Sequence, residues 1–264
     1  MGEVLKKSEV GHKGIGAEYI REGLREKGGY GTCCLMNFTV TVLTLFPEMF
    51  PGVLGHSVVG RALKEGKWAL KVLNIRDFTT DKHRTVDDTP YGGGAGMVMK
   101  PDVVAAAIRA AREELPEARV VFLAPTGKRF MQADARRFAA HAGGLIMLCG
   151  HYEGIDERVI EAEVDEVVSI GDFVLSGGEP VAVCLLDAVV RLLPGVLGAE
   201  ASLHEESFDI VDENGGALVE YPHYTRPPVW EGMEVPAVLQ GGNHGEIRKW
   251  RLARAKERTK RLKV

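Results

Sequence analysis

Short apolar, β-branched runs alternate along this chain with longer segments in which apolar residues recur every three or four positions. The runs predict strands over residues 38–45, 68–75, 119–124, 145–148 and 167–170. The periodic segments predict helices over residues 47–65, 101–115, 132–141, 180–193 and from 244 onward. Strands that alternate with helices are typical of an α/β fold with a mostly parallel sheet.

Three stretches lack this pattern and divide the chain. Residues 1–35 are rich in glycine and charge and contain no convincing strand, so we expect them to be disordered. Residues 76–90 predict a long polar loop, and such loops in compact domains are usually functional or disordered. Residues 199–221 are polar and acidic and predict a flexible interdomain linker. The linker would separate a main domain, residues 36–198, from a small basic helical domain, residues 222–264.

The stretch from residue 149 to 179 is the strongest candidate for a binding site. Two of the predicted buried strands, 145–148 and 167–170, open there into turns that are rich in glycine, Asp and Glu. Open α/β sheets bind ligands at such strand ends, and glycine lets backbone groups approach a ligand closely. Two ordinary tight turns would share this pattern, but the acidic content of both turns favours a small-molecule pocket.

Composition narrows the class of protein. The 264 residues, 45% of them hydrophobic, suffice for one large domain or two modest ones, and no apolar run is long enough to predict a transmembrane helix. Cys33, Cys34, Cys149 and Cys184 lack zinc spacing and form a poor disulfide set, and the eight histidines form no metal-type pair. The sequence therefore predicts a reduced, cytoplasmic protein without a membrane segment or a His/Cys metal centre.

Charge is distributed unevenly. Nine of the 33 Lys and Arg residues, but two of the 37 Asp and Glu residues, lie in residues 244–264, so this tail carries +7 and the remainder −11. A basic tail on an acidic body favours contact with a polyanion. A solvated helix face accounts for the charge equally well.

A set of short motifs spread over residues 36–258 gives the chain a specific resemblance. The motifs are LFPEMF at 45–50, RDFT at 76–79, HRTVDD at 83–88, PYGGG at 90–94, the whole of 149–179, PGVLG at 194–198, PHYTRP at 222–227 and GNH at 242–244. Together they resemble the bacterial tRNA (guanine-N1)-methyltransferases of the TrmD type, in the SPOUT superfamily.

The resemblance implies a fold, an assembly and an activity. The fold would be a SPOUT-type parallel sheet with a deep trefoil knot, followed by a small helical C-terminal domain. The protein would be a homodimer that shares each active site between subunits. It would transfer a methyl group from S-adenosyl-L-methionine to N1 of the guanine at tRNA position 37, an unpaired base next to the anticodon. Two alternatives stay open: a non-catalytic RNA-binding or assembly protein on the same scaffold, and a knotted methyltransferase for another RNA.

This chemistry defines the residues that the site needs. Guanine N1 must lose its proton, and negative charge then builds on O6, so a carboxylate base and a cationic donor are required. By resemblance the donor is Arg191, which on the residues alone is a cation at a helix C-terminus. The base would be Glu206, where the family has aspartate, with Glu205 and Asp209 as neighbouring alternatives. All three carboxylates also fit a solvated acidic linker.

The resemblance places the methyl donor against three strand ends, with apolar walls for the adenine and polar turns for the methionine end. The implied cofactor residues are Phe122, Leu123, Pro125, Gly150, Tyr152, Glu153, Gly154, Ile170, Gly171, Asp172, Phe173, Val174, Leu175, Gly177 and Gly178. Glu153 is also the carboxylate that the resemblance links to a magnesium ion. Pro180 directly follows Glu179, whereas the family often has leucine and then proline there.

The implied tRNA contacts fall in the polar loop, in the PHYTRP segment and on the basic helix. Lys and Arg in such positions contact phosphates and make binding sensitive to salt. The residues are His83, Arg84, Asp87, Asp88, His223, Tyr224, Arg226, Arg248 and Arg251.

Overall fold

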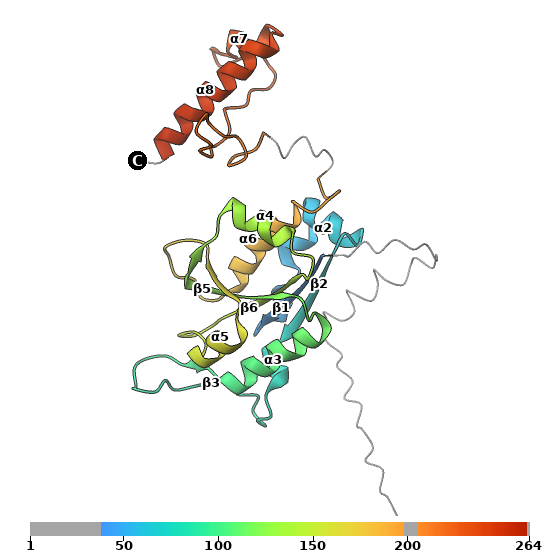
Figure 1. Ribbon diagram of the computed structural model, residues 1–264, viewed down its shortest axis with the longest axis vertical. Helices are drawn as coiled ribbons and strands as arrows, with labels where there is room; N and C mark the ends of the chain where they lie inside the picture. The colour runs from blue at the N-terminus through green and yellow to red at the C-terminus, as the bar shows by residue number, and fades with distance from the viewer. Residues whose placement is uncertain (1–37, 198–204, 263–264) are drawn as a thin grey trace, which may run out of the picture. The chain divides into compact units, whose positions relative to one another are not determined.

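The computed structural model describes residues 38–197 and 205–262 (Figure 1). The chain divides into two compact units, of which the first ends at Val196 and the second begins at Leu197. The segment 1–35, predicted to be disordered, lies outside the described residues. None of the helices in the described ranges has the length and apolar character needed to cross a membrane.

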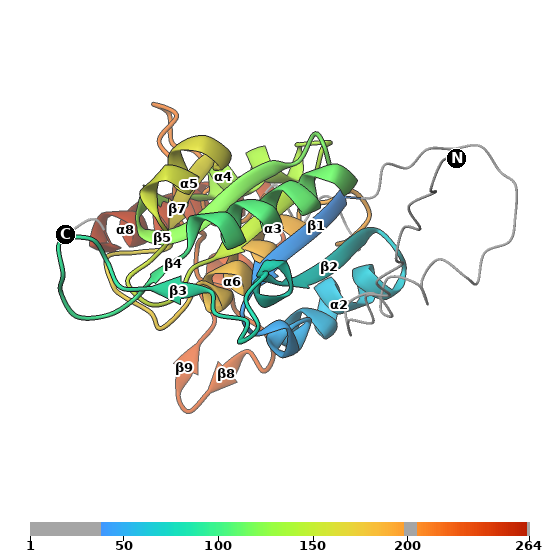
Figure 2. The same ribbon diagram turned by 90° about the horizontal axis from the view of Figure 1, so that it is seen from below.

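The first unit is a three-layer α/β structure built on a parallel sheet of five strands in the order β2-β1-β6-β5-β7. Helices α3 and α5 lie on one face of the sheet, and α2, α4 and α6 lie on the other (Figures 1 and 2). The predicted parallel α/β sheet is thereby confirmed. The strands of the sheet are β1 (Phe38–Thr44), β2 (Trp68–Asn74), β5 (Arg119–Arg129), β6 (Leu145–Cys149) and β7 (Glu166–Ser169). The helices are α2 (Ser57–Lys64), α3 (Pro101–Glu114), α4 (Gln132–Ala139), α5 (Glu157–Glu163) and α6 (Glu179–Val190).

Alternating side chains of each central strand form two separate cores, one on each face of the sheet. In β6, Met147 packs with the α2, α4 and α6 side, whereas Leu148 packs with the α3 and α5 side. Both residues are fully buried, which explains why β6 reads as a continuous apolar run rather than an alternating one. Each face of β6 is therefore covered by its own core up to the carboxyl end of the strand.

Two predicted elements differ from the structure. The helix predicted over 47–65 is shortened: η1 (Pro47–Met49) and η2 (Gly52–Gly55) are single 3-10 turns, and α2 begins only at Ser57. Proline and glycine interrupt the first half, since neither supports an α-helix interior. The strand predicted to end at residue 124 instead continues to Arg129, because β7 pairs with β5 a second time beyond an irregularity between Leu123 and Lys128.

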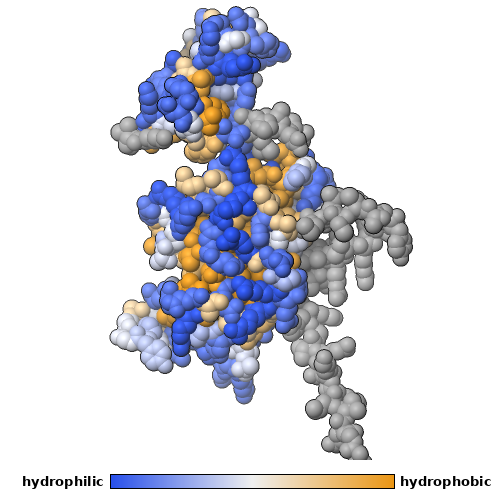
Figure 3. Space-filling model, in the orientation of Figure 1, coloured by the Kyte–Doolittle hydropathy of each residue, from blue (hydrophilic) through white to orange (hydrophobic). Residues whose placement is uncertain are grey.

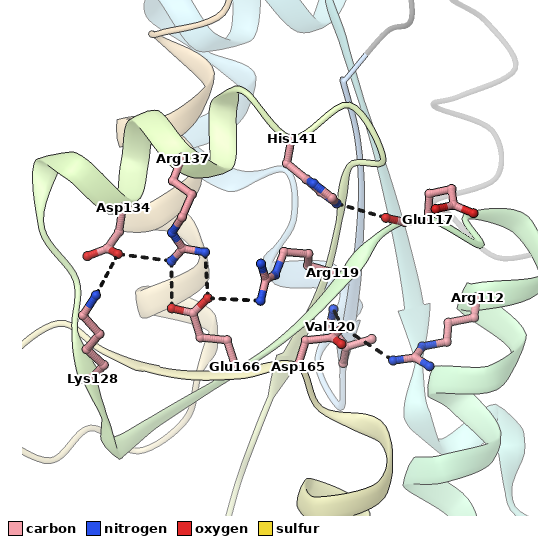
Figure 4. Close-up of polar contacts among 10 residues, drawn as sticks. All are labelled: Arg112, Glu117, Arg119, Val120, Lys128, Asp134, Arg137, His141, Asp165 and Glu166. Carbon is pink, nitrogen blue, oxygen red and sulfur yellow. Dashed lines mark hydrogen bonds and ion pairs between the residues drawn. The ribbon is translucent and has the colours of Figure 1, made fainter.

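A ladder of charged side chains fastens this second part of β5 to its neighbours (Figure 4). Asp134 of α4 accepts hydrogen bonds from Lys128 Nζ at 3.2 Å and from Arg137 at 3.1 Å. Arg137 also donates to both carboxylate oxygens of Glu166, at 2.8 and 2.9 Å. Asp134 is largely buried, and bidentate Arg–carboxylate pairs of this kind are directional. The ladder thus ties the end of β5 and the start of α4 to Glu166, the first residue of β7.

The long polar loop of the first unit contains little regular structure. It holds η3 (Ile75–Phe78) and β3 (Asp87–Asp88), and β3 pairs antiparallel with β4 (Val98–Met99). Met99 also forms a parallel bridge with Ile155, and Glu153 N–H donates to Met97 O at 2.9 Å. The loop is therefore joined at its end to the turn that follows β6.

The second unit is organised around α8 (His244–Leu262) and includes α7 (Ala237–Gln240; Figure 1). It also contains a hairpin of β8 (Val229–Trp230) and β9 (Met233–Glu234; Figure 2). Residues 205–221, the described part of the predicted linker, fold against α8. Leu218 and Tyr221 are buried, and Val219 N–H donates to Thr259 Oγ1 at 2.9 Å. The segment is thus part of a small folded unit.

Candidate functional site

A cavity of about 340 Å³ lies at the carboxyl edge of the sheet, at the bend of β5 and at the ends of β6 and β7. Its walls come from the bend of β5 after Leu123, the turn after Cys149 and the turn after Ser169. In Figure 3 hydrophobic surface extends across the middle of the first unit, between polar regions above and below. A mostly apolar concave site of this size at parallel strand ends is typical of small-molecule pockets.

All of the predicted cofactor residues except Asp172 line this cavity. Asp172 is an exposed residue whose carboxylate forms an ion pair with Arg129 at 2.8 Å. The cavity also takes in residues outside the predicted cofactor set. Seven of them lie within the stretch 149–179 that was predicted as a pocket: His151, Ile155, Glu157, Ile160, Val168, Ser169 and Ser176. Sequence reasoning missed Ala124, Thr126 and Val181, although Ala124 and Thr126 flank the predicted Pro125.

Glycines let the walls of the cavity pack closely. A Cβ on Gly150 would lie 2.8 Å from the ring of Phe122, and a Cβ on Gly178 would lie 2.7 Å from Cys149 Cα. Real Cβ atoms do not approach other atoms so closely, so any larger residue would push the turns apart. The shape of the cavity therefore depends on these glycines.

Thr44, His151 and Glu179 form a polar cluster beside the cavity that sequence reasoning missed. Glu179 is buried and accepts hydrogen bonds from Thr44 Oγ1 at 2.5 Å and from His151 Nε2 at 2.8 Å. Burial, together with the nearby charge of Glu179, raises the pKa of the Cys149 thiol well above its usual value. Cys149 therefore stays a neutral core residue.

The predicted tRNA residues of the first unit surround a turn that Asp81 holds in place. The Asp81 carboxylate accepts hydrogen bonds from the backbone N–H groups of His83 and Thr85, at 3.2 and 3.1 Å. Hydrogen bonds, the largest from Thr85, lower the pKa of Asp81 to about 2. Arg84 has a positive φ of 56° and forms an ion pair with Asp77. Asp87 and Asp88 lie in β3.

The predicted catalytic residues lie in different units. Arg191 is the C-cap residue of α6, as expected for a cation at a helix C-terminus. Glu206 is half-buried in a turn of the second unit, where its carbonyl accepts from Asp209 N–H at 3.1 Å. Glu205, an alternative base, forms an ion pair with Arg251 at 2.9 Å and accepts a hydrogen bond from the Tyr221 hydroxyl.

The predicted tRNA residues of the second unit include aromatic and basic side chains. His223 and Tyr224 are exposed, and the Tyr224 ring lies 6.2 Å from that of Trp250. Arg251 lies over the ring of Tyr221, whose pKa is raised to about 12 by burial and by its hydrogen bond to Glu205. Arg226 is exposed and precedes a cis peptide bond to Pro227.

The basic charge of α8 is partly neutralised by carboxylates of the same unit. The ion pairs on the helix are Lys249–Glu246, Arg251–Glu205, Arg254–Glu257, Lys256–Glu213 and Arg261–Glu257. Arg248 and Lys260 form no ion pair with any residue that the structure describes. The count of basic residues therefore overstates the charge available to a polyanion.

The cavity residues offer a small molecule both apolar walls and polar turns. Apolar side chains such as Phe122, Leu123 and Ile170 provide flat walls, and the turns offer backbone polar groups and the Glu153 and Glu157 carboxylates. Within residues 38–197 and 205–262, no three His, Cys, Asp or Glu side chains are grouped so as to hold a metal ion.

A parallel α/β sheet with a small-molecule cavity at the bends of three adjacent strands defines an open-sheet ligand-binding protein. Sequence comparison names the family. Residues 36–264 match the model of the family described as tRNA (Guanine-1)-methyltransferase TrmD, and the chain belongs to that family.

Curated relatives agree with this assignment. The tRNA (guanine-N(1)-)-methyltransferase of Rhizobium etli is 54% identical over 82% of this chain and 89% of its own length. The protein of the same name from Novosphingobium aromaticivorans is 57% identical over 82% of this chain and 85% of its own length. That from Mesorhizobium japonicum is 56% identical over 85% of this chain and 94% of its own length.

Proposed function

We propose that this protein transfers a methyl group from S-adenosyl-L-methionine to N1 of the guanine at position 37 of tRNA. The observation that carries the proposal is the cavity at the strand ends, which is lined by two turns of the motif stretch 149–179 and by the bend of β5. The methyl donor would occupy this cavity, with its adenine against Phe122, Leu123 and Ile170. When bound, it supplies an electrophilic methyl group, and the chain supplies position and proton transfer.

Two side chains would act on the guanine. Glu206 would accept the N1 proton, and Arg191 would stabilise the negative charge that builds on O6. Glu205, which bonds to Arg251 and Tyr221, and Asp209 are the neighbouring alternatives for the base. The residues predicted to contact tRNA would place the anticodon loop, and Arg248 is one of the exposed α8 cations that form no ion pair with a described residue.

We further propose the knotted SPOUT topology and a homodimer. The strand order, in which β6 lies between β1 and β5, and the second pairing of β5 with β7 support a threaded connection. Exposed Phe46, Met49 and Val53 on the first unit support a contact with a second copy. Sedimentation should give twice the chain mass of 28.7 kDa.

The deciding test is methyl transfer from labelled S-adenosyl-L-methionine to a tRNA transcript with guanine at position 37, against a matched transcript with adenine there. We expect N1-methylguanine in the digest of the first transcript only. Cofactor binding without transfer would instead support a non-catalytic RNA-binding protein or a different RNA substrate.

Single-turnover rates of three carboxylate variants then locate the base. Glu206→Gln should slow transfer by about 10²- to 10⁴-fold, as is usual for loss of a general base. Glu205→Gln and Asp209→Asn are matched controls that should retain most activity. A near-normal rate for Glu206→Gln would remove that residue from the mechanism.

A further inference from the structure

A buried carboxylate lies behind the cavity wall and draws together three distant parts of the first unit. Glu179 is 1% exposed, and its two oxygens accept hydrogen bonds from His151 Nε2 at 2.8 and 2.9 Å, while Thr44 Oγ1 donates at 2.5 Å. The three residues come from the start of α6, the turn after β6 and the end of β1. A buried carboxylate is costly unless it is well paired, so this arrangement calls for a function.

The cluster joins two walls of the cavity. His151 lines the cavity, and Glu179 opens α6 directly after the glycine turn. A Cβ on Gly177 would lie 2.6 Å from both Glu179 Oε2 and His151 Nε2, so the turn packs directly on this pair. Gly178 N–H also donates to Gly150 O at 3.1 Å. The separation of the two turns is therefore set by the cluster.

The same cluster holds the segment that leaves β1. Thr44 Oγ1 accepts a hydrogen bond from Phe46 N–H at 2.9 Å, and the Phe46 ring lies 4.9 Å from the His151 ring. Phe46 is partly exposed and is the second residue of the LFPEMF motif. A substitution at Glu179 would therefore alter the packing of both the cavity wall and this surface segment.

We propose that Thr44, His151 and Glu179 are positioning residues for methyl transfer. They set the spacing of the two turns that hold the methyl donor, and thereby its affinity and orientation, without touching the reacting atoms. The first turn of α6 suits the Glu179 carboxylate, because a helix N-terminus favours negative charge. The inference rests on the proposed function of the cavity.

Calorimetric titration with S-adenosyl-L-methionine, followed by single-turnover methylation of the guanine-37 transcript, tests the proposal. Glu179→Gln and His151→Ala should weaken cofactor binding at least about tenfold, as expected for losing a hydrogen bond to a charged group. Added imidazole should restore binding to His151→Ala, since it refills the site of the lost ring. Rates at saturating cofactor should stay reduced in Glu179→Gln, because orientation is also lost.

Glu163→Gln is the matched control. Glu163 is a second largely buried carboxylate, paired with Arg109 Nε at 2.7 Å on α5, outside the cavity lining. Its loss should lower the melting temperature and leave cofactor affinity unchanged. If Glu163→Gln and Glu179→Gln weaken cofactor binding equally, the effect reflects a general loss of stability, and the proposal is overturned.

The remaining outcomes are separable. A wild-type protein that does not bind S-adenosyl-L-methionine contradicts the proposed function itself. Wild-type binding with unchanged affinity in both cluster variants overturns only the positioning role. If Glu179→Gln fails to fold, Thr44→Val decides, because it removes the two hydrogen bonds of Thr44 Oγ1, with Glu179 and with Phe46 N–H, at nearly constant volume. It should weaken binding by about threefold or more, and unchanged binding refutes the proposal.

Discussion

Gly178 offers the sharpest test of how the cavity is built. Its backbone, with φ −80° and ψ −14°, is open to any residue, so Gly178→Ala introduces no backbone strain. The new Cβ would lie 2.7 Å from Cys149 Cα and 3.1 Å from Gly150 N. Because these are backbone atoms of a central strand end, no flexible side chain can move aside.

The size of the effect follows from two opposing contributions. Ordinary contact begins at 3.4 Å, so the start of α6 must retreat by about 0.7 Å from β6. Overpacking of this kind costs about 1–3 kcal/mol. Replacing glycine restricts the unfolded chain and returns about 0.4–1 kcal/mol. Together these two ranges allow a net loss between about 0 and about 2.6 kcal/mol in the free energy of unfolding of the first unit, and we expect the middle of that span, about 1–2 kcal/mol.

Calorimetry supplies the assay, and Gly241 supplies the control. A loss of this size should lower the melting temperature by about 2–8 °C in a unit of this size. Cofactor affinity should fall about tenfold if roughly 1.4 kcal/mol of the strain is relieved by opening the wall. Gly241 has nearly the same backbone, φ −83° and ψ −3°, but a Cβ there would meet nothing closer than 3.8 Å. Gly241→Ala should therefore leave cofactor affinity unchanged and should not lower the melting temperature, and a Gly178→Ala variant indistinguishable from it would refute the packing argument.

Two further predictions concern charge. Burial opposes ionisation of Asp134, but hydrogen bonds from Arg137 and other donors outweigh it and lower the pKa of Asp134. The pKa of this carboxyl is thus lower in the folded state than in the unfolded state. The ionised Asp134 therefore stabilises the fold above about pH 4, and this stabilisation is lost as the pH falls. Asp134→Asn should cost about 1.5–3 kcal/mol in unfolding free energy at pH 7 and flatten the acid limb of a melting-temperature profile, and a profile parallel to wild type would contradict this. Arg248→Ala should reduce the steepness of log K for tRNA binding against log salt concentration by about one. Arg254→Ala should change this slope less, because the Arg254 guanidinium already pairs with Glu257. Equal slopes for the two variants would show that the ion pair has no influence on tRNA binding.

Local pattern was enough to predict most of the elements of the first unit. The buried runs became β1, β2, β6 and β7, and the periodic segments became α3, α4 and α6, each within a few residues of its expected bounds. Such segments are readable because a strand or helix must place its apolar residues at a fixed period to bury one face. The cavity was anticipated for the same reason, since glycine at a strand end marks a local backbone requirement.

What the sequence could not reveal are contacts between residues far apart in the chain. Thr44 and Glu179 are 135 positions apart, and nothing in either segment indicates that a threonine ending one strand will donate to a carboxylate opening a helix. The extension of β5 to Arg129 likewise required β7 beside it, and the partial neutralisation of α8 required Glu205 and Glu213 to fold back on it. Periodicity determines which face of an element is buried, whereas only the packed tertiary structure decides which polar groups meet, because their pairing energy depends on a distance that no local pattern encodes.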